Sequence, residues 1–227
     1  MNSLQRRTIP VQTESSAPLI SARLFNLIMA GLIFLGFCVM GLGVGIVTNT
    51  GFMARFDANG LLGLILLIGG PIVGIVLMSS AVKRQSVPLS LVGYALFVST
   101  FGLFCSAALA QYDLPTINAA FMATAAITLV FGVLGLTFPH VFQRIIGVLV
   151  VALIALCVVQ VAMALLGVDQ SWLDIAVIVV FCGFIGYDMH QASIIEPTLP
   201  NAVFMASNLF LDIMNIFIRM LDVMDRR

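Results

Sequence analysis

The stretch NAVFMASNLFLDIMNIFIRMLDVM, residues 201–224, decides how the rest of the chain is arranged. Most of its residues are Phe, Leu, Ile, Met and Val, as in a helix that crosses a membrane. An ionised carboxylate in the hydrocarbon of a bilayer costs at least about 2.5 kcal/mol. The stretch therefore predicts a helix buried in a bundle, with its polar side against protein or enclosed water. That side holds polar residues at alternating steps of four and three, which share one helix face: Asn208, Asp212, Asn215, Arg219 and Asp222.

The composition is that of a polytopic membrane protein. Of the 227 residues, 61% are hydrophobic and 9% are charged, whereas about 25% of the residues in soluble domains are charged. The formal net charge is zero, which gives no indication of a nucleic-acid partner. The cysteines lie singly in apolar runs without a CxxC pair, so small apolar packing residues are favoured over disulfides or metal ligands: Cys38, Cys105, Cys157 and Cys182.

The chain divides into a polar cytosolic tail, residues 1–23, and a single transmembrane domain, residues 24–227. Gly69-Gly70-Pro71 is expected to kink the second helix of this domain, and Pro139-His140 to end the fourth. The predicted fold class is an all-α polytopic membrane protein, a bundle of seven transmembrane helices. The helices are expected at 24–47, 61–82, 88–110, 117–138, 145–166, 172–189 and 201–224.

Basic residues predict the orientation, because loops rich in Lys and Arg stay in the cytosol. Seven crossings then place the C-terminus on the opposite side, where Arg226 and Arg227 depart mildly from the rule. A re-entrant last segment is the alternative. The residues that mark the cytosolic side are Arg6, Arg7 and Arg23 before the first helix, Lys83 and Arg84 after the second, and Arg144 after the fourth.

Asp188 and Asp212 are the acids placed in the apolar depth of the chain or at its edge. Asp188 lies near the cytosolic end of the sixth helix, and Asp212 lies about three turns into the seventh, which returns from that side. If the helices are neighbours, the two carboxylates come close together. Two close carboxylates do not both ionise at low cost, so the pair would exchange a proton near physiological pH. When ionised, the pair would offer hard oxygen ligands to a transient Ca²⁺.

A structural role for these acids is the alternative. Each aspartate could cap a helix end or pair with Arg219. Such a role is easier for Asp188, near a helix terminus, than for Asp212, deep inside its helix. Arg219 and Asp222 are expected to form an interfacial ion pair with each other. Asn208 and Asn215 are expected to form hydrogen bonds to neighbouring helices.

Two runs, FCGFIGYDMHQ (residues 181–191) and ASNLFLDIMNIFIRML (residues 206–221), resemble the C-terminal signature of the Bax-inhibitor-motif proteins, the transmembrane Bax inhibitor or lifeguard superfamily. That signature is an aromatic-Asp pair at the end of the sixth helix and an aromatic-Leu-Asp-Ile-x-Asn-x-Phe run on the seventh. The resemblance implies a seven-helix bundle with the last helix at its centre, wrapped by the other six. It also implies calcium leak across a membrane, pH-dependent gating and protection from cell death.

The resemblance assigns roles to individual residues. It places the family's pH-sensing pair on Asp188 and Asp212, and a basic latch to the first aspartate in the region of Lys83 or Arg84. Two departures are present. The second helix carries no acid where some relatives have a glutamate, and the turn after the fourth helix reads PHVF rather than basic-x-Asp.

The predicted function is a pH-sensitive calcium or cation leak channel without a tightly bound cofactor, whose partners are membrane lipid, Ca²⁺ and protons. The alternative is a regulatory membrane protein that acts through protein partners, as an anti-cell-death factor or protease modulator, without flux. An enzyme is not predicted, because the Gly-x-Gly-Asp motif and Pro-Ala-Leu turn of presenilin-type proteases are absent. The expected membrane is the plasma membrane in a bacterium, and the endoplasmic reticulum or Golgi in a eukaryote or virus. The oligomeric state stays open.

Overall fold

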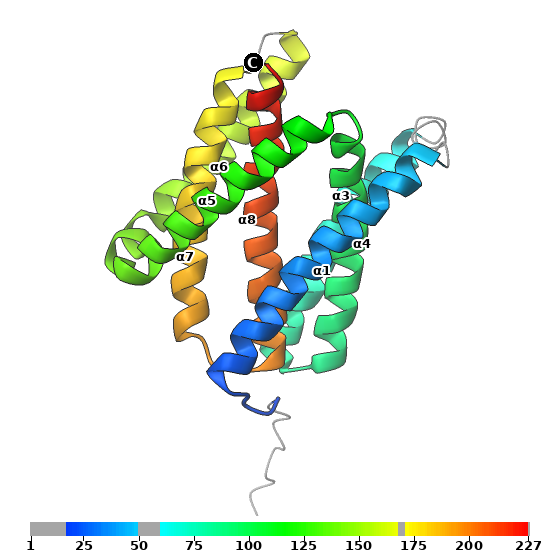
Figure 1. Ribbon diagram of the computed structural model, residues 1–227. Coiled ribbons are helices and arrows are strands. Elements are labelled where there is room, and N and C mark those ends of the chain that lie inside the picture. Colours follow the sequence, from blue (N-terminus) through cyan, green and yellow to red (C-terminus); the bar gives the residue numbers. More distant parts are fainter. Residues whose placement is uncertain (1–16, 50–59, 168–170, 227) are drawn as a thin grey trace, which may run out of the picture.

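The computed structural model describes residues 17–49, 60–167 and 171–226. Helices dominate this part of the chain, and its one β pairing is an isolated bridge between Leu19 and Thr198. Helices satisfy their own backbone hydrogen bonds, as a segment in lipid must. The predicted all-α bundle is therefore confirmed (Figure 1). The helices are α1 (Ala22–Asn49), α3 (Gly60–Arg84), α4 (Val87–Leu109), α5 (Leu114–Thr137), α6 (Pro139–Leu166), α7 (Ser171–Ile194) and α8 (Leu199–Asp225).

Within the described residues, α1 and α4 to α8 are each long and apolar enough to cross a membrane. The last helix, α8, is one continuous helix of 27 residues, about 40 Å long. It has the length of a full crossing and not of a re-entrant half-helix. The chain is therefore an integral, multi-pass membrane protein.

Two helix boundaries differ from expectation. A single residue, Phe138, separates α5 from α6, and Pro139 opens α6 instead of only ending α5. Proline suits the first helical position because the N–H that it lacks has no partner there. The other difference is that α7 continues to Ile194, so Asp188 lies within the helix and not at its end. Pro71 lies inside the single helix α3.

The central element is α8, which packs against α1, α3, α4, α5 and α7 (Figure 1). In its most apolar window 67% of the residues are buried, compared with 0% for α6. The expectation that six helices wrap α8 is therefore corrected to five. Helix α6 packs mainly on α7 and lies at the periphery, where its side chains face the lipid.

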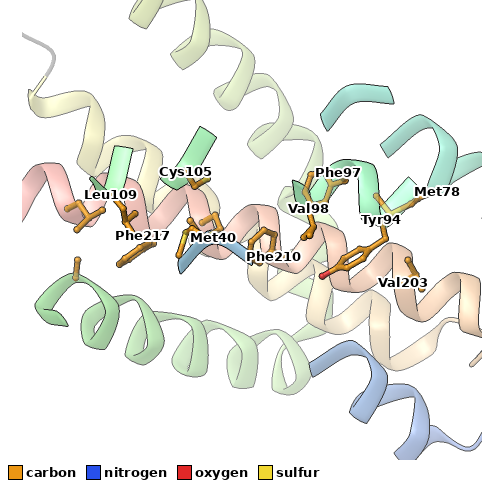
Figure 2. Close-up of a cluster of buried hydrophobic side chains, with 13 residues drawn as sticks. Met40, Met78, Tyr94, Phe97, Val98, Cys105, Leu109, Val203, Phe210 and Phe217 are labelled. Carbon is orange, nitrogen blue, oxygen red and sulfur yellow. The ribbon is translucent and has the colours of Figure 1, made fainter. Parts of the chain in front are cut away.

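The largest group of buried side chains follows one side of α8 (Figure 2). Phe210 of α8 lies in its middle and is 0% exposed. Its ring meets those of Phe37, Phe97 and Phe101 edge to face, with centroids 5.5, 6.3 and 6.1 Å away. Such pairs contribute about 0.5–1.5 kcal/mol each beyond the area that they bury. These contacts fix α8 against α1 and α4.

A close approach of two backbones fixes α7 against α5. A Cβ atom added to Gly135 of α5 would lie 2.1 Å from the carbonyl oxygen of Gly186 on α7. Small residues of this kind let membrane helices pack closely. Because Gly186 precedes Asp188 by two residues, this contact also sets the height of Asp188 in the bundle.

Basic residues mark one end of the bundle, which we call the basic end: Arg23, Lys83, Arg84 and Arg144. The segment before α1 is held there, since the Ile20 amide donates to the Pro197 carbonyl in the α7–α8 connection at 2.8 Å. From this end α8 runs to the opposite one, which we call the C-terminal end (Figure 1). Most of the predicted tail, with Arg6 and Arg7, and also Arg227, lie outside the described residues.

Candidate functional site

Asp188 of α7 and Asp212 of α8 line one cavity of about 250 Å³. The hairpin of α7 and α8 brings the two acids to this place, as their positions on neighbouring antiparallel helices suggest. Helix α6 closes the cavity from the side with two apolar residues. The complete lining is Ile146, Leu153, Phe181, Phe184, Tyr187, Asp188, Asn208, Leu211 and Asp212.

The two carboxyl groups differ in their burial. Asp212 is 5% exposed, and its Oδ2 atom is buried without a hydrogen-bond partner in the described part of the chain. Asp188 is half-buried. Over the same residues, no ion pair or hydrogen bond joins either carboxylate to the other or to a basic group. Oxygen atoms of both acids are thus available to a ligand that enters the cavity.

Other polar groups in the cavity are few. The Tyr187 hydroxyl accepts a hydrogen bond from Gln191 Nε2, 2.7 Å away and one turn later in α7. Asn208 is half-buried and lies one turn before Asp212. Calcium in a stable site takes six to eight oxygen ligands. The described residues contain no group of three or more His, Cys, Asp or Glu side chains that could hold a metal ion. The cavity could therefore contact a cation but not enclose it.

The basic residues considered as a latch lie at the basic end. Lys83 and Arg84 occupy the last turn of α3 and are exposed. Neither forms an ion pair with Asp188 among the described residues. The latch is not closed in this conformation, and its existence stays a prediction.

The expected ion pair of Arg219 with Asp222 is wrong. Arg219 Nη1 instead lies 2.9 Å from Asp174 Oδ1 on α7, and Asp222 accepts a hydrogen bond of 2.5 Å from the Tyr112 hydroxyl. The side chain of Asp174 is 3% exposed. A buried carboxylate needs a counter-charge more than an exposed one does. Arg219 therefore pairs with the acid that has the least access to solvent.

Asp174 is a buried acid that the sequence analysis did not single out. It lies in the first turn of α7, where a carboxylate also faces the positive end of the helix dipole. Its second oxygen, Oδ2, lies 2.8 Å from Arg226 Nη2. The sequence feature that could have identified Asp174 as buried is its position directly before the apolar run of α7.

The two asparagines of the polar face do not tie α8 to its neighbours. Asn215 Nδ2 donates to the Leu211 carbonyl of its own helix at 2.8 Å. Asn208 lines the cavity without a hydrogen bond to another described residue. The expected helix–helix hydrogen bonds of both residues are therefore absent from the described structure.

Two titratable groups lie outside the spanning helices, in the connection between α4 and α5. Burial, and then the hydrogen bond to Asp222, raises the pKa of the Tyr112 hydroxyl. Hydrogen bonds from Thr116 lower the pKa of Asp113, which caps α5 by accepting from the Thr116 amide at 3.0 Å.

Comparison with known proteins identifies the family. No curated protein gives a significant match. The family model described as "Inhibitor of apoptosis-promoting Bax1" matches residues 20–227, nearly the whole chain. The match includes every helix of the bundle and both acids of the cavity, so the chain belongs to the Bax inhibitor family.

Proposed function

We propose that the protein is a pH-sensitive leak pathway for Ca²⁺ or similar cations, in which Asp188 and Asp212 sense protons. The observation that carries this proposal is the Oδ2 atom of Asp212, which is buried in a cavity without a hydrogen-bond donor. A carboxylate in membrane depth is costly and marks an ion or proton pathway more often than a structural feature.

The physical mechanism follows from two carboxyl groups in one small cavity. With a proton bound to the pair, the charge in the cavity is low and α7 and α8 stay together. Loss of that proton leaves two negative charges, which repel each other and attract a cation. The repulsion pushes α7 away from α8, and the cation replaces the proton as the counter-charge. Flux should therefore rise as the pH rises.

A closed pathway on one side of the cavity is consistent with this mechanism. Toward the C-terminal end, α7 and α8 are sealed by buried apolar side chains, which we call the apolar plug. Cations would cross this region only after the helices separate, because a dry apolar constriction excludes ions. The plug consists of Val177, Phe181, Cys182, Ile185 and Ile216.

The test is calcium flux into liposomes that contain the purified protein and a trapped fluorescent indicator, measured from pH 5.5 to 8. The unchanged protein should conduct with a rate that rises with pH, and Asp212→Asn should lose this dependence. Asp113→Asn is the matched control, because Asp113 is an exposed acid in the α4–α5 connection. Equal flux and equal pH dependence in the protein and in Asp212→Asn would exclude the proposed role.

A second candidate function is regulation of another membrane protein without flux. The observation that favours it is the lipid-facing surface of α6, where Val151 and Val158 are 67% and 63% exposed. A partner helix could pack there. Photo-crosslinkers at these two positions should then capture a defined membrane protein, and the cell phenotype should survive Asp188→Asn with Asp212→Asn.

A further inference from the structure

At the C-terminal end of the bundle, four polar side chains form a cluster that the proposed sensor does not use. We call it the Asp174 cluster. It joins three helices near their ends: Gln160 comes from α6, Asp174 from α7 and Arg219 from α8, and Arg226 directly follows α8. Gln160 Oε1 accepts from Arg219 Nη2 at 3.0 Å, and the two arginines take the two oxygens of Asp174.

Burial within the cluster is graded. The side chain of Asp174 is 3% exposed, that of Arg219 is 21% exposed and that of Arg226 is 44% exposed. The pair of Asp174 with Arg219 is therefore the inner contact, and Arg226 covers it from the outside. Removing one partner of a buried pair costs much more than removing an exposed one, because a charge is left without compensation.

The cluster lies in line with the cavity. Arg219 follows Asp212 by seven residues on the same face of α8, about 10 Å along the helix axis. Asn215 lies between them on that face, and the apolar plug fills the space between α7 and α8 at the same height. A cation that moves between the cavity and the C-terminal end along this face would meet the positive charge of Arg219.

We propose that the Asp174 cluster is the gate at the C-terminal end of the pathway, with Asp174 as the residue that holds it closed. Asp174 binds α7 to Arg219 on α8, and this contact keeps the apolar plug compressed. Opening requires Asp174 to separate from Arg219, and the cost of that separation favours the closed state. The inference rests on the proposed function only in calling the cavity part of an ion pathway.

The test measures access to the gate without measuring flux. In a variant whose two accessible cysteines, Cys38 and Cys157, are replaced by alanine, Asn215→Cys reports on the space between Arg219 and Asp212. The buried Cys105 and Cys182 are kept, because Cys182 belongs to the apolar plug, and their reaction is subtracted with the matching variant that retains Asn215. Asn215 suits this purpose because it is half-buried and its side chain bonds only to its own helix in the described structure. The probe is 2-hydroxyethyl methanethiosulfonate, applied to the protein in nanodiscs. It is uncharged, so its reaction rate does not respond directly to the charge that Asp174→Asn removes. Probe molecules that reach the cysteine from the basic end contribute the same background reaction rate in every variant.

With Asp174→Asn added, the reaction rate of the cysteine should rise at least tenfold. Tyr112→Phe is the matched control, because it breaks a hydrogen bond to α8 at the same end without touching the cluster. Its rate should equal that of the parent. Arg226→Gln, which removes only the half-exposed partner, should give an intermediate rate, and it decides the question if Asp174→Asn does not fold. Equal rates in the parent and in the folded cluster variants would overturn the proposal.

The same variants separate the gate from the proposed function. In liposomes, Asp174→Asn should raise calcium flux several-fold at every pH while the pH dependence set by Asp188 and Asp212 remains. A raised cysteine reaction rate without calcium flux in any variant would support the gate and exclude the calcium leak. Raised flux without a change in the cysteine rate would contradict the gate and leave the leak standing.

Discussion

Arg219 of α8 and Asp174 of α7 form an ion pair of 2.9 Å at the C-terminal end of the bundle, and Arg226 binds the second oxygen of the same carboxylate at 2.8 Å. The positive-inside rule predicts that the basic end faces the cytosol, so these two arginines depart from that rule. Their shared bond to the buried Asp174 gives them a structural role at this end instead. The helix α8 runs without a break from Leu199 to Asp225, which is the length of a full crossing, so it does not turn back within the membrane.

The two arginines of this cluster should differ in their effect on stability. Arg219→Met removes the inner partner of Asp174 and the contact with Gln160, and we expect a loss of about 3 kcal/mol in the free energy of unfolding. Arg226→Met removes a half-exposed partner and should cost less than about 1 kcal/mol. Unfolding of both variants in mixed micelles would measure the difference. Equal losses in the free energy of unfolding would show that the inner and outer arginines stabilise the protein equally, whatever their burial.

The contact of α5 with α7 should not tolerate a methyl group. Gly135→Ala places a Cβ atom against the Gly186 carbonyl, so the helices must separate, at a cost of at least about 2 kcal/mol. Gly147→Ala is the control, because nothing lies within 4 Å of a Cβ atom there. The control should be neutral or stabilising by up to about 1 kcal/mol. The comparison of melting temperatures checks this, and a Gly135→Ala protein as stable as Gly147→Ala would refute the close approach.

The hydrogen bond of Tyr112 with Asp222 should attach the α4–α5 connection to α8. Tyr112→Phe should cost about 1 kcal/mol, less than the roughly 1.5–3 kcal/mol of a buried bond to a charged group, because the site is only half-buried. The raised pKa of Tyr112 means that this stability is present below pH 10 and is lost as the pH rises further. A double-mutant cycle with Asp222→Asn measures the coupling. Additive losses would mean that the two groups do not interact.

Asp113 should make the stability of α5 sensitive to acid. Because hydrogen bonds from Thr116 lower the pKa of Asp113, its contribution is present above pH 3.8, the ordinary value, and is lost as the pH falls through the lowered one. Asp113→Asn keeps a capping side chain that cannot titrate. The melting temperature of the protein should therefore fall relative to that of Asp113→Asn only below about pH 4. A constant difference from pH 3 to 7 would contradict the cap.

Much of the fold could be predicted from the sequence because the bilayer sets the length of each apolar run. The helix expected at 88–110 is Val87–Leu109 in the structure, and the polar face of residues 201–224 identified the buried helix. The start of α6 was missed because Pro139 reads equally well as the end of one helix and the start of the next. The mean hydropathy of α6 already indicated its peripheral position, although the sequence analysis did not use it. Its mean hydropathy of 3.0 exceeds the 1.5 of α8, as expected for the helix with most contact to lipid.

The candidate site was predictable in part. The spacing along α8 places Asp212 on a buried face, and the α7–α8 hairpin brings Asp188 near it. The partner of Arg219 was not predictable in the same way. The spacing of residues shows which side chains of one helix are neighbours, and it therefore suggested Asp222 as the partner of Arg219. The actual partner, Asp174, depends on the rotation and height of α7 relative to α8, which only tertiary packing sets.

The central helix is also the one that the ribosome makes after the other six helices of the described structure. Until α8 leaves the ribosome, the surfaces of α1, α3, α4, α5 and α7 that will face it can contact only lipid or one another. Phe210 and Asp212 then enter together, one completing the apolar core and the other bringing an acid into it. Among the described spanning helices, the least apolar one is thus also the one made after the helices that surround it. A chain interrupted before α8 would expose to lipid the surfaces that α8 covers in the structure.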